Sequence, residues 1–181
     1  YYMESRKAQA HAMENAKQVI LDVAKDFEKI SGRKYGLIEE YKMDDAEYAM
    51  VIIGSAAGTA KEAVDEMRED GKKVGIIKIR SFRPFPGEEI ATSLKKCKAV
   101  AVMDRCESFS TNGGPVGAET MQAMYTNGCT AKAINIMYGI GGRDVTVGDM
   151  RGVYDTLEEI AKTGETGPTY RYMGLRDKEA K

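Results

Sequence analysis

The sequence predicts an α/β domain with a mainly parallel sheet that is covered by helices on both faces. Two observations lead to this prediction. Four short runs of apolar residues recur along the chain, and a segment whose apolar residues repeat every three or four positions follows each run. Apolar strands that alternate with amphipathic helices are typical of a parallel sheet that is buried on both sides.

A long helix is predicted first, over residues 3–30. Its apolar residues form one stripe, made of Met13, Ala16, Ile20, Val23, Phe27 and Ile30. Gly32 then stands where a glycine commonly ends a helix. We expect the stripe to pack either on the domain that follows or on another subunit, so residues 1–34 are interpreted as an amphipathic helical arm.

The alternating elements follow in order. Strands are expected at residues 48–54, 73–79, 98–104 and 131–139, and a further short strand fits residues 35–39. Helices are expected around residues 60–67, 88–96, 115–125 and 149–162. The α/β domain therefore extends over residues 35–163. Residues 164–181 lack periodicity, and we expect this tail to be loose or to wrap around a neighbour.

The overall charge is nearly balanced, with 27 basic and 28 acidic residues. This balance gives no reason to expect nucleic acid or an acidic membrane surface as the partner. Apolar runs such as residues 49–53 and 99–103 are much shorter than the ~20 residues of a membrane span. The N-terminus reads as a polar helix without a secretion signal. We therefore expect a cytoplasmic protein that binds neither nucleic acid nor a membrane.

Cysteine and histidine are too sparse for the common metal sites. Cys97, Cys106 and Cys129 are widely spaced and form no Cys-x-x-Cys pair, and His11 is the one histidine. These cysteines alone cannot build a zinc site or an iron–sulfur cluster, and a site with several histidines is excluded. We expect free thiols in a reducing compartment, and no metal or cofactor held by this chain.

The turn Gly54–Thr59, with the sequence GSAAGT, is a candidate nucleotide-binding site. The dinucleotide fingerprint would need glycines two and five residues after Gly54, where the chain has Ala56 and Thr59. The P-loop pattern fails as well, in its last three places. We interpret the segment as a structural turn, with Thr59 and Glu62 spaced as a capping box. Its backbone N–H groups can still attract an anion.

Two further loops follow the carboxyl ends of predicted strands, where ligands of open α/β sheets bind. The loop 80–89 carries Arg83 and is stiffened by two prolines, so it also reads as a rigid connector whose aromatic residues dock on an adjacent domain. The loop 104–114 carries Arg105 and Asn112 and leads into a helix that begins with proline. It fits an anion or substrate contact and an ordinary capped loop equally well.

A glycine-rich loop over residues 138–149 follows the last predicted strand. Thr146 and Asp149 are spaced to cap the helix behind it, and Arg143 and Asp144 could reach across an interface. No two carboxylates in the chain stand out as an acid/base pair, and no nucleophile has an evident base beside it. By itself, the chain is not expected to be catalytic.

Three stretches together resemble a known family: EEYKMDDAEYAMVIIGSAAGTAKEAVDEMREDGKKVGIIKIRSFRPFPGEEI, AVMDR and YGIGGRDVT. The combination is similar to the C-terminal part of the alpha subunit of pyruvate:ferredoxin oxidoreductase, which is also called pyruvate synthase. The pieces RPFP and GGRDVT are the most specific. The likeness extends from the N-terminal helix to about residue 162.

The resemblance implies a three-layer α/β sandwich similar to the transketolase C-terminal domain. It also implies an enzyme that oxidatively decarboxylates pyruvate with coenzyme A to acetyl-CoA, carbon dioxide and reduced ferredoxin, or runs in reverse. In the family, the alpha subunit has a further N-terminal domain of the thiamin-diphosphate type. Partner subunits hold the diphosphate end of thiamin diphosphate and the iron–sulfur clusters, and magnesium belongs to the whole enzyme.

No catalytic residue of the family carries over to this chain, so the resemblance implies a domain that supports and flanks the active site and is inactive alone. If coenzyme A or the substrate touches this domain, Arg83, Arg105 and Asn112 are the expected contacts. The expected partners are the other subunits of the complex and, through the whole enzyme, ferredoxin.

Other functions stay open. The chain also fits a self-sufficient anion- or nucleotide-binding module that uses residues 54–59. A further alternative is the corresponding domain of a 2-oxoacid dehydrogenase. Oxidoreductases for 2-oxoglutarate or branched-chain 2-oxoacids also stay open, because their alpha subunits share much of the pattern.

Overall fold

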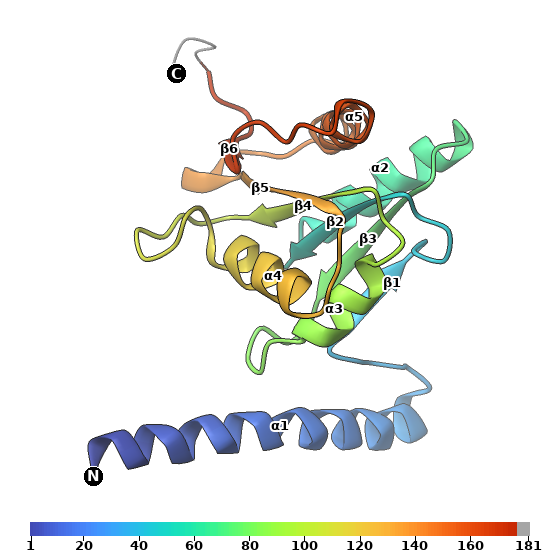
Figure 1. The fold of residues 1–181 in the computed structure, drawn as a ribbon. Coiled ribbons are helices and arrows are strands. Elements are labelled where there is room, and N and C mark those ends of the chain that lie inside the picture. The colour runs from blue at the N-terminus through green and yellow to red at the C-terminus, as the bar shows by residue number, and fades with distance from the viewer. Residues whose placement is uncertain (177–181) are drawn as a thin grey trace.

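The computed structural model describes residues 1–176 and shows a central six-stranded sheet (Figure 1). The strands are β1 (Ile38–Tyr41), β2 (Tyr48–Ile53), β3 (Val74–Ile79), β4 (Ala99–Asp104), β5 (Lys132–Met137) and β6 (Tyr170–Tyr172). Their order across the sheet is β1-β3-β2-β4-β5-β6. β1 is antiparallel to β3, and the other neighbouring pairs are parallel. The prediction of a mainly parallel α/β sheet is confirmed.

Helices cover both faces of the sheet, so the fold has three layers (Figure 1). They are α1 (Tyr2–Ser31), α2 (Ala57–Glu69), α3 (Gly87–Leu94), α4 (Pro115–Thr126) and α5 (Val147–Thr163), with a short 3-10 turn, η1 (Ile140–Gly142). α2 packs beside α5 on one face, and α3 packs beside α4 on the other. The long helix α1 runs along the outside of the α3/α4 layer. The expected three-layer sandwich with a long N-terminal helix is confirmed.

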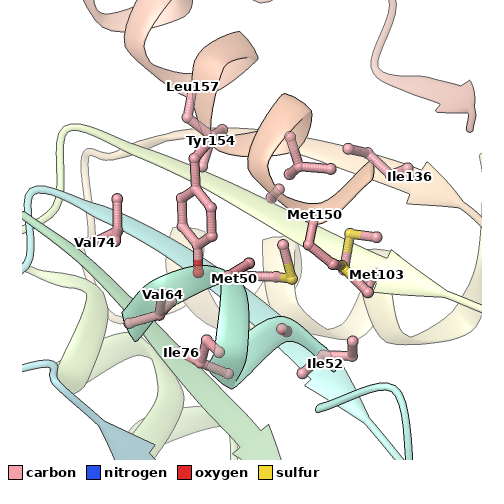
Figure 2. Close-up of a cluster of buried hydrophobic side chains, with 14 of the residues drawn as sticks. Met50, Ile52, Val64, Val74, Ile76, Met103, Ile136, Met150, Tyr154 and Leu157 are labelled. Carbon is pink, nitrogen blue, oxygen red and sulfur yellow. The ribbon is translucent and has the colours of Figure 1, made fainter. Parts of the chain in front are cut away.

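The larger hydrophobic core lies between the sheet and the α2/α5 layer (Figure 2). The residues that the sequence places on the inner sides of these helices are buried, including Val64 of α2 and Met150 and Leu157 of α5. Tyr154 of α5 is fully buried, and its hydroxyl donates a hydrogen bond of 2.9 Å to the carbonyl of Gly75 in β3. This bond lets a large amphipathic side chain fill the core without an unpaired polar atom.

The aromatic residues of the loop between β3 and α3 pack on their own domain. Phe82 and Phe85 lie against the second core, between the sheet and the α3/α4 layer, and their rings meet edge to face with centroids 6.1 Å apart. Both rings are half-buried there. The apolar surface expected from an adjacent domain is thus supplied, at least for the buried half of each ring, by the chain itself.

The helix α1 ends as predicted at Gly32, which adopts the left-handed conformation with φ of 70°. The domain covers only part of its predicted apolar stripe. Ile20 is half-buried beside Lys17, which pairs with Glu89 of α3 at 2.6 Å. Val23, on the same predicted stripe, remains exposed. The predicted stripe therefore does not pack against the domain along its whole length.

The two edge strands differ from the prediction. The first one, β1, begins at Ile38 and ends two residues later than the expected segment 35–39. The other, β6, was not predicted: it lies in the tail that we expected to be loose or to wrap around a neighbour, and it pairs in parallel with β5. Three residues are too few to show a periodicity, whereas the open edge of β5 offers backbone groups that need partners. Residues 177–181 of the expected tail lie outside the described residues.

The helix starts follow the predicted caps with one exception. Thr146 and Asp149 form the expected capping box of α5, and Pro115 is the first residue of α4. The capping box expected from Thr59 is wrong, because α2 already begins at Ala57 and no side chain caps it. The backbone N–H groups at the start of α2 thus have no side-chain acceptor from the residue before the helix.

No helix within residues 1–176 is both long and apolar enough to cross a membrane.

Replacing Tyr154 by phenylalanine removes the hydroxyl that donates to Gly75. We expect the free energy of unfolding to fall by about 1–2 kcal/mol, because a buried hydrogen bond is lost while the ring packing stays. Urea unfolding followed by circular dichroism measures the change. The matched control is Tyr125→Phe, since Tyr125 is 87% exposed on α4, and its effect should stay below about 0.5 kcal/mol. Equal effects of the two substitutions would contradict this account of the core.

Candidate functional site

The candidate site lies at the carboxyl ends of β2, β4 and β5. The strand β2 stands between β3 and β4 in the sheet. From β2 the chain passes through α2 to β3 on one side, and from β4 it passes through α4 to β5 on the other side. The loops after β2 and β4 therefore lead away from each other, and open α/β sheets bind their ligands beside such a reversal.

A buried pair of polar side chains, Asp104 of β4 and Asn135 of β5, organises this edge of the sheet. Both are 1% exposed. The carboxylate of Asp104 accepts hydrogen bonds from the backbone N–H groups of Val116 (3.1 Å) and Gly117 (2.8 Å) and from Nδ2 of Asn135 (2.9 Å). The Oδ1 atom of Asn135 accepts from the N–H of Gly114 at 2.8 Å. The pair therefore ties β4 and β5 to the start of α4.

The glycines at the start of α4 are required by this close approach. A Cβ atom at Gly114 would overlap the carboxyl group of Asp104, and one at Gly117 would overlap the amide of Asn135. The N-terminus of α4 is consequently occupied by the protein's own carboxylate. Asp104 is the last residue of the strand predicted over residues 98–104, whereas the sequence pattern did not single out Asn135. A single amide side chain inside an otherwise apolar strand was the signal that could have identified it.

A cavity of about 300 Å³ lies at the start of α2. The loop after β2 contributes Ser55 and Ala56, and the first turn of α2 contributes Thr59. The loops after β4 and β5 contribute the rest of the lining: Arg105, Tyr138, Gly139, Gly142, Arg143, Asp144 and Val145. The turn Gly54–Thr59 therefore forms one wall of a real cavity, although it matches neither nucleotide motif.

Two guanidinium groups line the cavity, from Arg105 and Arg143. The Nε atom of Arg105 donates to the carbonyl of Gly139 at 3.2 Å, and the residue is exposed overall. Among residues 1–176, neither arginine forms an ion pair, whereas Arg68, Arg80 and Arg151 all do. Positive side chains beside an uncapped helix start can attract a phosphate or a carboxylate.

The phenol of Tyr138 also lines the cavity and is almost completely buried. Burial raises the pKa of Tyr138 above its ordinary value, and the nearby Arg105 partly opposes this shift. The side chain therefore stays neutral at physiological pH and offers a hydroxyl that can donate or accept a hydrogen bond.

The structure does not gather the three predicted contact residues in one place. Arg105 lines the cavity. Arg83 instead forms an ion pair of 2.5 Å with Glu119 of α4, and its guanidinium group lies 4.2 Å from the ring centre of Phe82. Asn112 is exposed in the loop before α4. The second arginine of the cavity, Arg143, was assigned to an interface by the sequence analysis.

The cysteines do not fit a metal centre. Cys97 is buried, and its thiol lies 3.6 Å from the carbonyl of Ala46. Burial raises the pKa of Cys97 to about 12, so it stays a thiol rather than the thiolate that binds metals. Cys106 is exposed in the loop after β4. Within residues 1–176, no group of three or more His, Cys, Asp or Glu side chains could hold a metal ion.

Comparison with known families gives one matching domain. Residues 46–150 match the family described as pyruvate:ferredoxin oxidoreductase core domain II. The chain is 42% identical over 169 residues to the alpha subunit of NADH-dependent phenylglyoxylate dehydrogenase of Aromatoleum evansii, covering 93% of this chain and 40% of that protein. It is 40% identical over 177 residues to pyruvate synthase subunit PorA of Thermotoga maritima, covering 98% of this chain and 44% of that protein.

A third relative is the ketoisovalerate oxidoreductase subunit VorA of Pyrococcus abyssi, with 40% identity over 97% of this chain and 44% of that protein. The chain thus spans less than half the length of these curated relatives. Among solved structures, the fold is similar to 2-oxoglutarate:ferredoxin oxidoreductase from Magnetococcus marinus, with a TM-score of 0.50 and 17% identity. That match covers 74% of this chain and 21% of the other, and it supports the fold alone.

Replacing Asp104 by asparagine tests the buried pair. An amide presents an N–H group to at least one of the donors that now bind the carboxylate, so we expect the free energy of unfolding to fall by about 2–3 kcal/mol. Asp144→Asn is the matched control, because Asp144 is exposed at the cavity, and its effect should be below about 0.5 kcal/mol. Urea unfolding measures both variants. Unchanged stability of the Asp104 variant would show that the carboxylate does not hold α4.

Proposed function

Because the chain belongs to the pyruvate:ferredoxin oxidoreductase family, we propose that it forms part of the alpha subunit of an enzyme that oxidatively decarboxylates pyruvate. The proposed reaction joins the acetyl group to coenzyme A, releases carbon dioxide and passes the electrons to ferredoxin, and it can run in reverse. The observation that carries the proposal is the match of residues 46–150 to core domain II of this family, together with 40% identity to a pyruvate synthase subunit over nearly the whole chain.

Within that enzyme, the proposed role of this domain is to support and flank the active site. The acidic side chain best placed at the carboxyl edge, Asp104, already binds the start of α4 with both oxygens. The enzyme's thiamin diphosphate, magnesium and iron–sulfur clusters would be held by the rest of the complex, since the cysteines of this chain do not fit a metal centre. We place the complex in the cytoplasm, with the other subunits and ferredoxin as its partners.

The cavity at the start of α2 is our proposed contact with an anionic group of coenzyme A or of the substrate. The support is the meeting of Arg105, Arg143 and an uncapped helix start around about 300 Å³ of space. Arg83 and Asn112 remain proposed contacts outside this cavity, and the ion pair with Glu119 makes Arg83 less accessible to a ligand than Arg105.

The same cavity favours one alternative of a different class, a self-sufficient anion-binding module. The two proposals differ in what this chain does by itself. Calorimetric titration of residues 1–181 with coenzyme A and with ATP separates them, because a self-sufficient module binds at micromolar concentration without other subunits. Relatives named for phenylglyoxylate and ketoisovalerate are about as similar as the pyruvate synthase subunits, so these 2-oxoacids are the competing substrates.

The proposed function predicts the activity of the intact complex, made from the full-length alpha subunit and the subunits encoded beside it. We expect reduction of ferredoxin or a viologen dye with pyruvate and coenzyme A, at a higher kcat/KM than with phenylglyoxylate, 2-oxoisovalerate or 2-oxoglutarate. We expect no dye reduction by residues 1–181 alone. Activity of this chain alone would overturn the supporting role, and a preference for another 2-oxoacid would overturn the substrate assignment.

Replacing Arg105 by alanine tests the cavity in the same complex. We expect the KM for coenzyme A to rise about tenfold with little change in kcat, because a charge-assisted hydrogen bond to the anion is lost. Arg151→Ala serves as the control, since Arg151 pairs with Glu66 of α2 and with Asp70 just after this helix, away from the cavity, and the KM should not change. If the double variant of Arg105 and Arg143 keeps the KM values for coenzyme A and for the 2-oxoacid, the cavity binds neither.

A further inference from the structure

The helix α1 differs from the other helices because it has no buried residue. Its 30 residues would span about 45 Å, yet none of them is buried against the domain. Helices α2 to α5 each bury between three and five residues. In Figure 1, α1 lies along one side of the molecule, with the α3/α4 layer on one flank and nothing on the other.

One side of α1 does contact the domain. Ile20, Leu21 and Ala24 are half-buried there. The ion pair between Lys17 and Glu89 of α3, at 2.6 Å, holds this side in place. At the carboxyl end of the helix, the ring of Phe27 meets the ring of Tyr35, with centroids 5.6 Å apart. These contacts bring one side of α1 against the domain.

A second apolar side of α1, rotated from the first by about a third of a turn, faces outward. We name it the outer stripe; it consists of Ala12, Val19, Val23 and Ile30. The three large residues are exposed to a high degree: Val19 by 60%, Val23 by 61% and Ile30 by 86%. Spacings of seven, four and seven residues keep them on one line along the helix, which is the pattern of a helix packed against another surface.

The polar side of α1 needs no partner of its own. Lys25 binds Asp22 at 3.1 Å, and Lys29 binds Asp26 at 2.8 Å, within the helix. Such pairs are typical of a face that points to water. The helix thus has three distinct sides, of which one contacts the domain, one is suited to solvent, and the outer stripe is apolar and uncovered.

The comparisons show how far the similarity to relatives extends around α1. The domain match covers residues 46–150 and so begins after α1, whereas the similarity to PorA covers 98% of this chain and includes α1. That relative is more than twice as long as the matched part, since the match covers 44% of it. The helix is therefore common to the longer subunits without being part of core domain II.

We propose that the outer stripe of α1 docks on the part of the same alpha subunit that lies outside this chain, so that α1 is packed between that part and the α3/α4 layer. This inference rests on the proposed function, because it requires the longer subunit. A second copy of the chain is a poorer occupant. A stable dimer interface buries about 800 Å² per partner, and four aliphatic side chains on one helix offer much less. A surface on the same polypeptide needs no association entropy and can be held by a small apolar contact.

A photo-crosslinking experiment in the intact complex tests this proposal. Benzoylphenylalanine is placed at position 23 in one variant and, as the matched control, at position 25 on the polar side in another. We expect irradiation to link position 23 to a peptide of the same alpha subunit outside residues 1–181, with no dimer on a denaturing gel, and position 25 to give no specific product. A product with another subunit or with a second copy would overturn the proposal.

A second measurement covers the case in which the bulky crosslinker disturbs packing. In the intact complex, Val23→Cys should react with a maleimide about tenfold more slowly than Lys25→Cys, and the two should react equally fast after denaturation. Peptide mass spectrometry reads each site separately from Cys106. Equal rates in the native complex would refute a covered stripe. Pyruvate-dependent dye reduction by the unmodified complex tests the proposed function independently, so a failure of either idea can be recognised.

Discussion

The buried carboxylate of Asp104 is the constraint on which the carboxyl edge of the sheet depends. A charged group removed from water needs a hydrogen-bond donor for each oxygen. Asp104 obtains these donors from the start of α4 and from Asn135 on the neighbouring strand. Only glycine at positions 114 and 117 lets the backbone come close enough. One satisfied charge therefore fixes two strands, a helix and the ends of the loop that joins them.

This constraint also makes the N-termini of α2 and α4, which lie at the same edge of the sheet, differ in their ability to bind an anion. The start of α4 is neutralised by the protein's own carboxylate, so it is closed to a second anion. The start of α2 has no side-chain cap and opens into the cavity that Arg105 and Arg143 line. The helices α2 and α4 look alike in the sequence, because each follows an apolar strand and a glycine-containing turn. They differ in that a carboxylate of the protein neutralises the N-terminus of α4 and, within residues 1–176, none neutralises that of α2. This difference is the physical basis of the contact proposed for an anionic group.

Most of the fold was predictable from the sequence because burial on both faces leaves a local signature. The four central strands are mostly apolar runs, and α2 and α5 carry apolar residues every three or four positions. Edge elements lack this signature: β6 has three residues and owes its existence to pairing with β5. The relatives named for three different 2-oxoacids are 40–42% identical to this chain, so the pattern of the domain does not by itself separate their substrates.

For the site, the sequence by itself determined the residue types at the strand ends, among them Asp104 and Arg105, and it excluded the dinucleotide and P-loop motifs. Only the tertiary structure decided which of these groups meet. It brought Arg143 to Arg105, paired Arg83 with Glu119, and showed that α1 keeps an apolar side uncovered. The physical reason is that the periodicity of apolar residues indicates which side chains are buried. It does not indicate which residues they contact, because those contacts depend on the packing of segments far apart in the chain.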